Sequence, residues 1–204
     1  GDGDTLTYSL SGTDASSFSI NSSSGVITFN SAPDYETKSS YSITVNVSDG
    51  TNTTTQSVTI NVTNVNEYSP VITSASSFYA DENQTAVGTV TATDADGDTL
   101  TYSLTGTDAS SLVINSSGVI TFNTAPDYET KTSYSVTVNV SDGTNTSSQA
   151  LTINISNVNE TSPVISSSAT FSAAENQTAV GTVTATDEDT SETLSYNLTG
   201  TNAS

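Results

Sequence analysis

Residues 134–140 read YSVTVNV, with an apolar side chain at every second position. The same alternation recurs in LTINI at 151–155 and in LTYSL at 100–104. Successive side chains of a β-strand point to opposite faces of its sheet, so this alternation predicts strands with one buried and one solvated face. Ser, Thr and Asn occupy most of the positions between, which suits the solvated face. We find no stretch with helical periodicity and therefore expect an all-β chain.

The chain repeats itself at a fixed distance. APDYETKSSYSITVNVSDGTNT, which begins at residue 32, returns as APDYETKTSYSVTVNVSDGTNT at residue 125, so the shift is 93 residues. A constant period of this length is typical of a tandem array in which each unit is one domain. About seven short strands per unit indicate an immunoglobulin-like Greek-key β-sandwich. We expect a partial repeat at 1–67, a complete repeat at 68–160 and the first strands of another at 161–204, cut from a longer array.

The composition argues against several classes of function. The formal net charge is −20, because 22 acidic residues stand against only Lys38 and Lys131, which we expect to be surface charges. Nucleic acids and anionic membranes are therefore poor partners. Cys and His are absent, which excludes disulfides and a Ser-His-Asp triad. No apolar run is long enough to span a bilayer, so we expect no membrane insertion in this segment.

Acidic motifs recur in register with the repeat. Carboxylates two residues apart on an extended chain point to the same side, so Asp127 with Glu129, and Asp94 with Asp96, can each act as a two-pronged clamp. Oxygen ligands without His or Cys argue against a typical zinc or copper site. Calcium accepts roughly six to eight such oxygens in irregular geometry, which fits carboxylates mixed with Asn amides. We interpret the acids outside these motifs as turn and surface residues: Asp14, Asp81, Asp98 and Asp108.

The ordered set of motifs resembles the cadherin repeat over the whole chain. In the complete unit it is carried by the base Glu82, the DxD motif Asp94-Ala95-Asp96, the DYE motif Asp127-Tyr128-Glu129, the late Asp142, and the linker NVNE at 157–160 before Pro163. The resemblance implies Ca²⁺ bound at the junctions between consecutive repeats. It also implies a non-enzymatic protein that acts outside the cell.

The resemblance implies one ligand set for each junction. Each set combines the base Glu and DYE motif of one repeat, the linker, and the DxD motif and late Asp of the next repeat, as far as this chain includes them. Near residue 67 the ligands would be Asp34, Glu36, Asn64, Asn66, Glu67, Asp94, Asp96 and Asp142. Near residue 160 they would be Glu82, Asp127, Glu129, Asn157, Asn159, Glu160, Asp187 and Asp189. The linkers have Asn and Glu where the family usually has Asp, so the number of ions per junction stays open.

Two other features of the sequence leave alternatives open. Asp127 and Glu129 could form a glycosidase-type acid pair, but a ligand role between repeats explains their recurrence better, so we predict no enzyme. Several N-x-S/T sequons offer possible glycosylation sites. Two of them alternate with apolar neighbours and should face solvent on adjacent strands. The sequons considered are Asn46, Asn61, Asn139 and Asn154.

We therefore predict a stalk, adhesin or filament segment at the cell surface or secreted, of prokaryotic type, in which calcium stiffens the array. Its first partners are the neighbouring repeats of the same chain, with copies of itself or surface glycans as further possibilities. The alternative is a carbohydrate-binding or accessory module of a large surface protein. That function needs exposed aromatic side chains, for which Tyr68, Phe78 and Tyr79 are the candidates. Self-association through exposed sheet edges is a third possibility.

Overall fold

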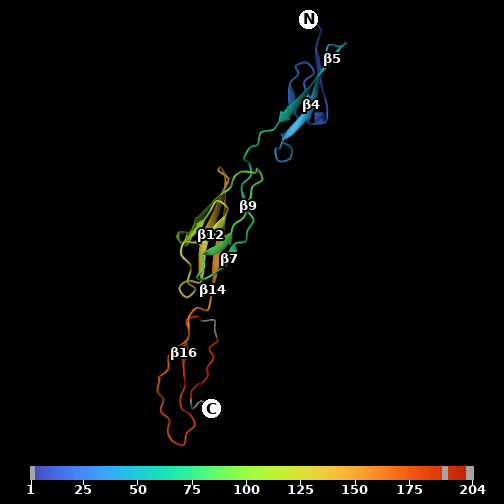
Figure 1. Ribbon diagram of the computed structural model, residues 1–204. Helices are drawn as coiled ribbons and strands as arrows, with labels where there is room; N and C mark the ends of the chain where they lie inside the picture. Colours follow the sequence, from blue (N-terminus) through green and yellow to red (C-terminus); the bar gives the residue numbers. More distant parts are fainter. Residues whose placement is uncertain (1–2, 190–192, 201–204) are drawn as a thin grey trace. The chain divides into compact units, whose positions relative to one another are not determined.

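The computed structural model describes residues 3–189 and 193–200 (Figure 1). Within these ranges the chain is all-β, and the only helices are two single 3-10 turns, η1 (Ala15–Ser17) and η2 (Ala109–Ser111). The expectation of an all-β chain is confirmed. The described residues form two compact units, one from 3–69 with 94–98 and one from 70–93 with 99–189 and 193–200. The three-repeat division predicted from the sequence remains a prediction.

The first sheet of the second unit contains the strands that the sequence alternation predicted. It is built from β7 (Ser77–Asp81), β10 (Thr101–Thr105), β13 (Ser133–Ser141) and β14 (Thr146–Ser156), in the order β10-β13-β14-β7. β10, β13 and β14 pair antiparallel, whereas β7 pairs parallel with β14. A parallel edge strand next to an antiparallel hairpin shows that β7 reaches this sheet by a crossover, not by a hairpin.

The second sheet of this unit has the order β11-β12-β8 and consists of β8 (Ala86–Thr89), β11 (Leu112–Ile114) and β12 (Val119–Phe122). A separate antiparallel pair joins β6 (Val71–Ile72) to β9 (Ala92–Thr93). β9 ends immediately before the acidic residue Asp94, so this pairing fixes where the acidic loop leaves the sandwich.

The hydrophobic core of the second unit lies between its two sheets. Along β13, Val136, Val138 and Val140 are at most 2% exposed, while the residues between them are only partly buried. They belong to one cluster with residues of the facing sheet such as Ile120 and Phe122. Burying an aliphatic side chain of this size stabilises the fold by roughly 1.5–3 kcal/mol. The alternation in YSVTVNV is therefore the pattern of a strand packed on one face.

The first unit repeats the same strand pairs. β1 (Thr7–Ser11), β4 (Ser40–Ser48) and β5 (Thr53–Asn61) form an antiparallel sheet in the order β1-β4-β5, and β2 (Phe18–Ile20) pairs with β3 (Ile27–Phe29). The register of β4 on β5 matches that of β13 on β14. The near-identical sequences therefore adopt the same hairpin in both units.

After residue 160 the described part of the chain contains two short strands, β15 (Val164–Ile165) and β16 (Ala185–Thr186), which pair antiparallel. The register repeats that of β6 on β9, because Val164 faces Thr186 as Val71 faces Thr93. β16 thus ends just before Asp187, as β9 ends just before Asp94, so the second acidic loop starts from the same structural position.

The two lysines lie at the surface as predicted, each with 41% of its side chain exposed, and each also forms an ion pair. Lys131 Nζ lies 2.5 Å from Asp108 Oδ1 and 4.5 Å from the ring centroid of Tyr134. The other carboxylate oxygen of Asp108 accepts a hydrogen bond from the amide of Ser135 at 2.8 Å. The hydrogen bond from Lys131 is the main reason why the pKa of Asp108 is lowered. Asp108 therefore ties the turn around η2 to β13.

The first unit contains the same arrangement. Lys38 forms an ion pair with Asp14 and lies 4.8 Å from the ring centroid of Tyr41. Asp14 also accepts a hydrogen bond from the amide of Ser42 at 2.7 Å. Asp14 and Asp108 are therefore structural ion-pair partners and not simply solvated turn acids.

Candidate metal centre

The loop that follows β9 gathers three carboxylates. The amides of Asp96 and Asp98 both donate to Asp94 Oδ1, at 3.0 and 3.3 Å. Gly97 has φ +77°, a conformation that favours glycine and lets the chain turn at this point. As a result, ligand oxygens of Asp94, Asp96 and Asp98 all lie within 4.8 Å of one another. The predicted clamp of Asp94 and Asp96 is thus joined by Asp98, so the prediction that Asp98 is only a turn and surface acid is wrong.

The linker closes over this loop through Asp96. Asp96 Oδ2 accepts hydrogen bonds from the main-chain amides of Glu67 at 3.0 Å and Tyr68 at 2.8 Å. Asn64 donates from Nδ2 to the carbonyl oxygen of Asp96 at 3.0 Å. Two linker residues predicted as ligands, Asn64 and Glu67, are therefore held against the DxD loop, and a third, Asn66, is half-buried between them.

Asp94 and Asp96 each bury a carboxylate oxygen that has no hydrogen-bond partner among the described residues. Asp96 is only 9% exposed, and its Oδ1 has no hydrogen-bond partner among the described residues. The same is true of Asp94 Oδ2. A buried carboxylate oxygen without a partner loses its hydration and gains nothing in return, which costs about 1–3 kcal/mol or more for a charged group. A cation at this position would remove that cost.

The DYE motif of the first repeat contributes to the same electrostatic environment. The pKa of Glu36 is raised, first by partial burial and then by the negative charges of Asp96 and Asp34. The pKa of the Tyr68 phenol is raised mainly by Asp34 and next by Glu67, with smaller contributions from Glu36 and Asp96. These acids therefore repel one another across a short distance, as expected where a cation binds.

Two predicted residues of this junction make other contacts. Both carboxylate oxygens of Asp34 accept hydrogen bonds from Thr37, one from its amide and one from its hydroxyl, which lowers the pKa of Asp34. Asp142 lies in the hairpin between β13 and β14, where the sequence predicted a turn, and its Oδ1 accepts from the amides of Thr144 and Asn145 at 2.7 and 2.6 Å. Asp142 belongs to the second compact unit and shapes its own turn.

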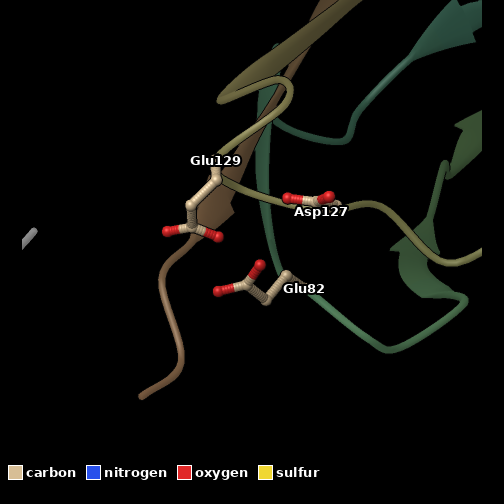
Figure 2. Close-up of side chains that lie close together, drawn as sticks. All are labelled: Glu82, Asp127 and Glu129. Atoms are coloured by element: carbon tan, nitrogen blue, oxygen red, sulfur yellow. The ribbon is translucent and has the colours of Figure 1, made fainter. Parts of the chain in front are cut away.

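A second cluster joins Glu82, Asp127 and Glu129, whose ligand oxygens also lie within 4.8 Å of one another. Figure 2 shows the three carboxylates turned toward one another, with Glu82 on the segment after β7 and the other two on the loop after β12. Glu82 is 1% exposed. Its Oε2 accepts from the amide of Tyr128 and its Oε1 from the amide of Val158, each at 2.7 Å. Glu82 thus connects the DYE motif to the linker.

The remaining two acids of this cluster are exposed. The pKa of Glu129 is raised, first by desolvation from the surrounding protein and then by the negative charges of Glu82, Asp189 and Asp127. Asp127 accepts hydrogen bonds from the amide and hydroxyl of Thr130, at 3.1 and 2.9 Å. The crowding of negative charge around Glu129 again favours a cation at this position.

The second linker repeats the contacts of the first. Asp189 Oδ2 accepts from the amides of Glu160 at 3.0 Å and Thr161 at 2.7 Å, as Asp96 does in the first linker. Asp189 is 1% exposed, and its Oδ1 has no hydrogen-bond partner among the described residues. Thr161 also donates its hydroxyl toward Asp187 Oδ1 at 3.0 Å and Asp189 Oδ2 at 2.8 Å. The hydrogen bond from the Thr161 amide is the main reason why the pKa of Asp189 is lowered.

The other linker residues of this junction have different surroundings. Both amide atoms of Asn157 are buried without a hydrogen-bond partner among the described residues, so this side chain is available to a ligand. Glu160 accepts a short hydrogen bond from the side chain of Asn83, which has φ +60° in the turn after Glu82. Asn159 is exposed. Asn83 is a contact that the sequence interpretation missed, although it directly follows the base glutamate.

All four sequon asparagines lie on strands, and Asn139 and Asn154 lie on the adjacent strands β13 and β14 as predicted, although both are half-buried. Asn139 and Asn46 hydrogen-bond to neighbouring side chains. Asn139 donates to Thr105 Oγ1 at 3.0 Å and accepts from Ser148 Oγ at 2.7 Å, and Asn46 donates to Ser11 Oγ at 3.0 Å. Asn61 is exposed and Asn154 is half-buried. Glycosylation of these residues remains a prediction.

The three aromatic side chains considered for carbohydrate binding have different surroundings. Phe78 packs against the core of the second unit. Tyr79 is 74% exposed on the edge strand β7, and Tyr68 is 44% exposed beside the acids of the first linker. The sequence-based expectation that Phe78 is an exposed aromatic is therefore wrong, because its position in the β-strand alternation turns it inward.

Comparisons with known proteins find relatives for both units. The sequence matches the Cadherin domain over residues 1–63 and the Bacterial Ig domain over residues 66–155. It is similar to Protocadherin Fat 4 of Homo sapiens, with 36% identity over 203 residues that cover 90% of this chain. The chain spans only 4% of the length of that relative.

Solved structures show the same architecture. Three extracellular repeats of mouse protocadherin-24 (EC1-3) superpose with a TM-score of 0.67 at 25% identity, covering 91% of this chain and 67% of that one. Repeats EC22-24 of mouse cadherin-23 superpose with a TM-score of 0.64 at 26% identity, covering 90% of this chain and 65% of that one. Among the described residues, no helix is sufficiently long and apolar to cross a membrane.

Proposed function

The chain belongs to the proteins built from cadherin-like repeats, and we propose that its acidic junctions bind Ca²⁺ and thereby stiffen a non-enzymatic array outside the cell. The proposed array is an adhesive or structural stalk. Its immediate partners are neighbouring repeats, and copies of the same chain are further candidates. The proposal extends to the division into a partial repeat at 1–67, a complete repeat at 68–160 and a further partial repeat at 161–204.

One observation carries the calcium proposal. Asp96 and Asp189 are both buried, and each directs one carboxylate oxygen to linker amides while the other oxygen has no hydrogen-bond partner among the described residues. A carboxylate that only stabilised the linker would not need to bury its second oxygen. The same arrangement at two positions with the same spacing supports a shared ligand, and hard oxygen donors suit calcium.

The mechanism that we propose is electrostatic. In the absence of cations, the acids of each linker region repel one another. The pKa values of Glu36 and Glu129 are raised first by desolvation, and neighbouring carboxylates add to both shifts. Calcium neutralises this repulsion and attaches the DxD loop, the linker and the DYE motif to one centre. The angle between consecutive repeats would then be restricted by metal coordination, which the hydrogen bonds of the linker alone cannot do.

Thermal unfolding of the 204-residue chain tests the proposal. A ligand that binds only the folded state raises its stability by RT ln(1 + [L]/Kd), so calcium at 100 times Kd adds about 2.7 kcal/mol per site. We expect a higher unfolding temperature in calcium than in chelator, and a smaller rise for the double variant Asp127→Ala/Glu129→Ala. Equal unfolding temperatures in calcium and chelator would contradict the proposal.

Small-angle scattering tests the stiffening separately from binding. We expect a broader distribution of the radius of gyration in chelator than in calcium, because the linkers then sample more angles. Magnesium at equal ionic strength is the control, since it prefers a smaller octahedral site and retains its water. Identical scattering profiles in calcium, chelator and magnesium would show that calcium does not stiffen the array.

A further inference from the structure

The first unit has an open apolar groove where the second unit holds two strands, and we infer that residues 170–183 of a second copy of the chain fill this groove. We call residues 170–183 the donor segment. Such a contact specifies how copies of the chain associate head to tail, and in this respect it rests on the proposed stalk function. Its sheet edges and apolar groove require no bound cation.

The second unit shows the filled form of the groove. β7 pairs with the edge of β14, and β8 pairs with the edge of β12. Beneath these strands Ile120 and Ile153 are both 0% exposed, and Val90, directly after β8, is 2% exposed. The amide of Thr152 in β14 donates to the carbonyl oxygen of Ser76, just before β7, at 3.1 Å. The two strands therefore close the core by apolar burial and by main-chain hydrogen bonds.

The same surface is open in the first unit. β5 and β3 are the counterparts of β14 and β12, and among the described residues no strand pairs with their outer edges. Ile27 and Ile60, the counterparts of Ile120 and Ile153, are only half-buried. An unpaired edge beside an apolar groove is a template for a further strand. The groove has a volume of about 320 Å³ and is lined by Phe18, Ile27, Thr28, Phe29, Val58 and Ile60.

The donor segment has the sequence that this groove requires. It reads TFSAAENQTAVGTV, and it differs at three positions from SFYADENQTAVGTV at 77–90, the segment that contains β7 and β8. The three positions that differ correspond to Ser77, Tyr79 and Asp81, which are the exposed residues of β7. The inward-facing positions of β7 are identical in the two segments. A surface that accepts one segment in the second unit can therefore accept the other in the first.

The apolar side chains of the donor segment are uncovered. No strand is assigned within 170–183, and every residue of this range is exposed. Phe171 and Val183 are 42% and 43% exposed, whereas Val90, the counterpart of Val183, is 2% exposed in the second unit. Burying an aliphatic or aromatic side chain of this size contributes roughly 1.5–3 kcal/mol. The donor segment therefore gains stability when it enters a groove like that of the second unit.

The donor segment also has the local shape of its counterpart. Asn176 has φ +62° and Asn83 has φ +60°, so both segments reverse direction at the same turn. The ring of Phe171 lies against Gly181, and the ring of Phe78 occupies the same place beside Gly88. A segment that already has its bound conformation loses less conformational entropy on binding.

A second cavity in the first unit matches the base glutamate of the donor segment. This cavity has a volume of about 50 Å³, and its lining includes Tyr35 and Val65, the counterparts of the two residues whose amides hold Glu82 in the second unit. Glu175 is the counterpart of Glu82, and it is exposed. In the complex its carboxylate would accept from the amides of Tyr35 and Val65 and join the acids at 34–36. The second copy thus supplies a side chain to this acidic cluster.

Sedimentation velocity of the 204-residue chain at increasing concentration tests the association. We expect species that grow beyond dimers, because a head-to-tail contact leaves a free groove and a free donor segment at the two ends. Val183→Asp places a charge at a position that becomes buried, so it should weaken the association about tenfold or more, the ratio that about 1.4 kcal/mol produces. The control is Thr182→Asp, which adds the same charge at a position whose counterpart, Thr89, is exposed; it should associate like the unmodified chain.

Mixing two variants tests the direction of the contact. Thr59 is the exposed counterpart of Thr152, so Thr59→Pro removes the amide that would pair with the donor segment, and a free edge strand tolerates proline. Thr59→Pro keeps its donor segment, and Val183→Asp keeps its groove. Each variant alone should stay monomeric at concentrations where the unmodified chain associates. An equimolar mixture should form heterodimers that do not grow further.

Hydrogen exchange locates the contact. On association the amides of Thr59, Tyr35 and Val65 should gain protection, and Val183→Asp should abolish this gain. A chain that stays monomeric at every concentration, in calcium and in chelator, would overturn the inference, as would unchanged association of Val183→Asp. In either case a higher unfolding temperature in calcium would still support the proposed function, which the association experiments do not test.

Discussion

The carboxylate of Asp96 accepts a hydrogen bond from the main-chain amide of Tyr68, 28 residues earlier in the chain, at 2.8 Å. Asp189 accepts the equivalent hydrogen bond from Thr161 over the same sequence separation. In both places one oxygen holds the linker, and the other is buried without a hydrogen-bond partner among the described residues. These hydrogen bonds hold the linker against the acidic loop through the protein's own groups.

Replacement of Asp96 should separate these two roles. Asp96→Asn keeps an oxygen that can accept from the amides of Glu67 and Tyr68 but removes the negative charge. We expect these amides to remain protected from hydrogen exchange in chelator, and the additional protection given by calcium to disappear. Asp96→Ala should lose protection in both conditions. Calcium-enhanced protection that persists in Asp96→Asn would show that the charge of Asp96 is not used for binding.

Glu82 should be important for stability even without calcium. Its two oxygens accept from the amides of Tyr128 and Val158, and the side chain is 1% exposed. Glu82→Ala leaves two main-chain amides without their carboxylate partner and removes a buried side chain, so we expect a loss of about 3 kcal/mol in unfolding free energy in chelator. Chemical denaturation measures this loss. Asp127→Ala is the matched control, because Asp127 is exposed and should cost much less in chelator; equal losses would contradict the assignment.

Asp108 should make stability depend on acid pH. Its pKa is lowered in the folded state by Lys131 and by the amide of Ser135, so its stabilising contribution is complete above the unfolded pKa of about 3.9. The contribution is lost as pH falls through the lower folded pKa. The loss of stability below about pH 4 should be smaller in Asp108→Asn than in the unmodified chain, as urea unfolding at stepwise pH would show. If the unfolding free energies of the variant and the unmodified chain fall in parallel with pH, the ion pair does not contribute to stability.

A side chain at Gly118 should destabilise the fold more than a side chain at Gly143, although both glycines have a positive φ. Gly118 has φ +77°, and a Cβ atom there would lie 2.2 Å from the carbonyl oxygen of Val90. Gly143 has φ +97° but no atom within 4 Å of the equivalent position. Gly143→Ala should cost about 1–2 kcal/mol for the left-handed backbone, and Gly118→Ala clearly more, because the β12 edge must move. Equal losses in thermal unfolding would contradict this geometry.

The regularity of the chain made much of the fold predictable. Val136, Val138 and Val140 alternate with polar residues, and a β-strand turns every second side chain to the same face, so the core positions of β13 could be identified without coordinates. The 93-residue recurrence located equivalent acids in the same way. Phe78 was misassigned because a run of three partly apolar residues, Phe78 to Ala80, does not reveal which face is buried.

The sequence by itself determined the all-β architecture, the repeat length and the kinds of ligand atom that the acidic motifs can offer, because these depend on local periodicity and side-chain chemistry. Only the tertiary structure showed that Asp98 turns toward Asp94 and Asp96, that Glu82 connects two distant main-chain amides, and that both lysines are used in ion pairs. These relationships join residues whose distance is set by loop closure and burial. Such distances depend on how the strands pack, which a motif in the sequence does not specify.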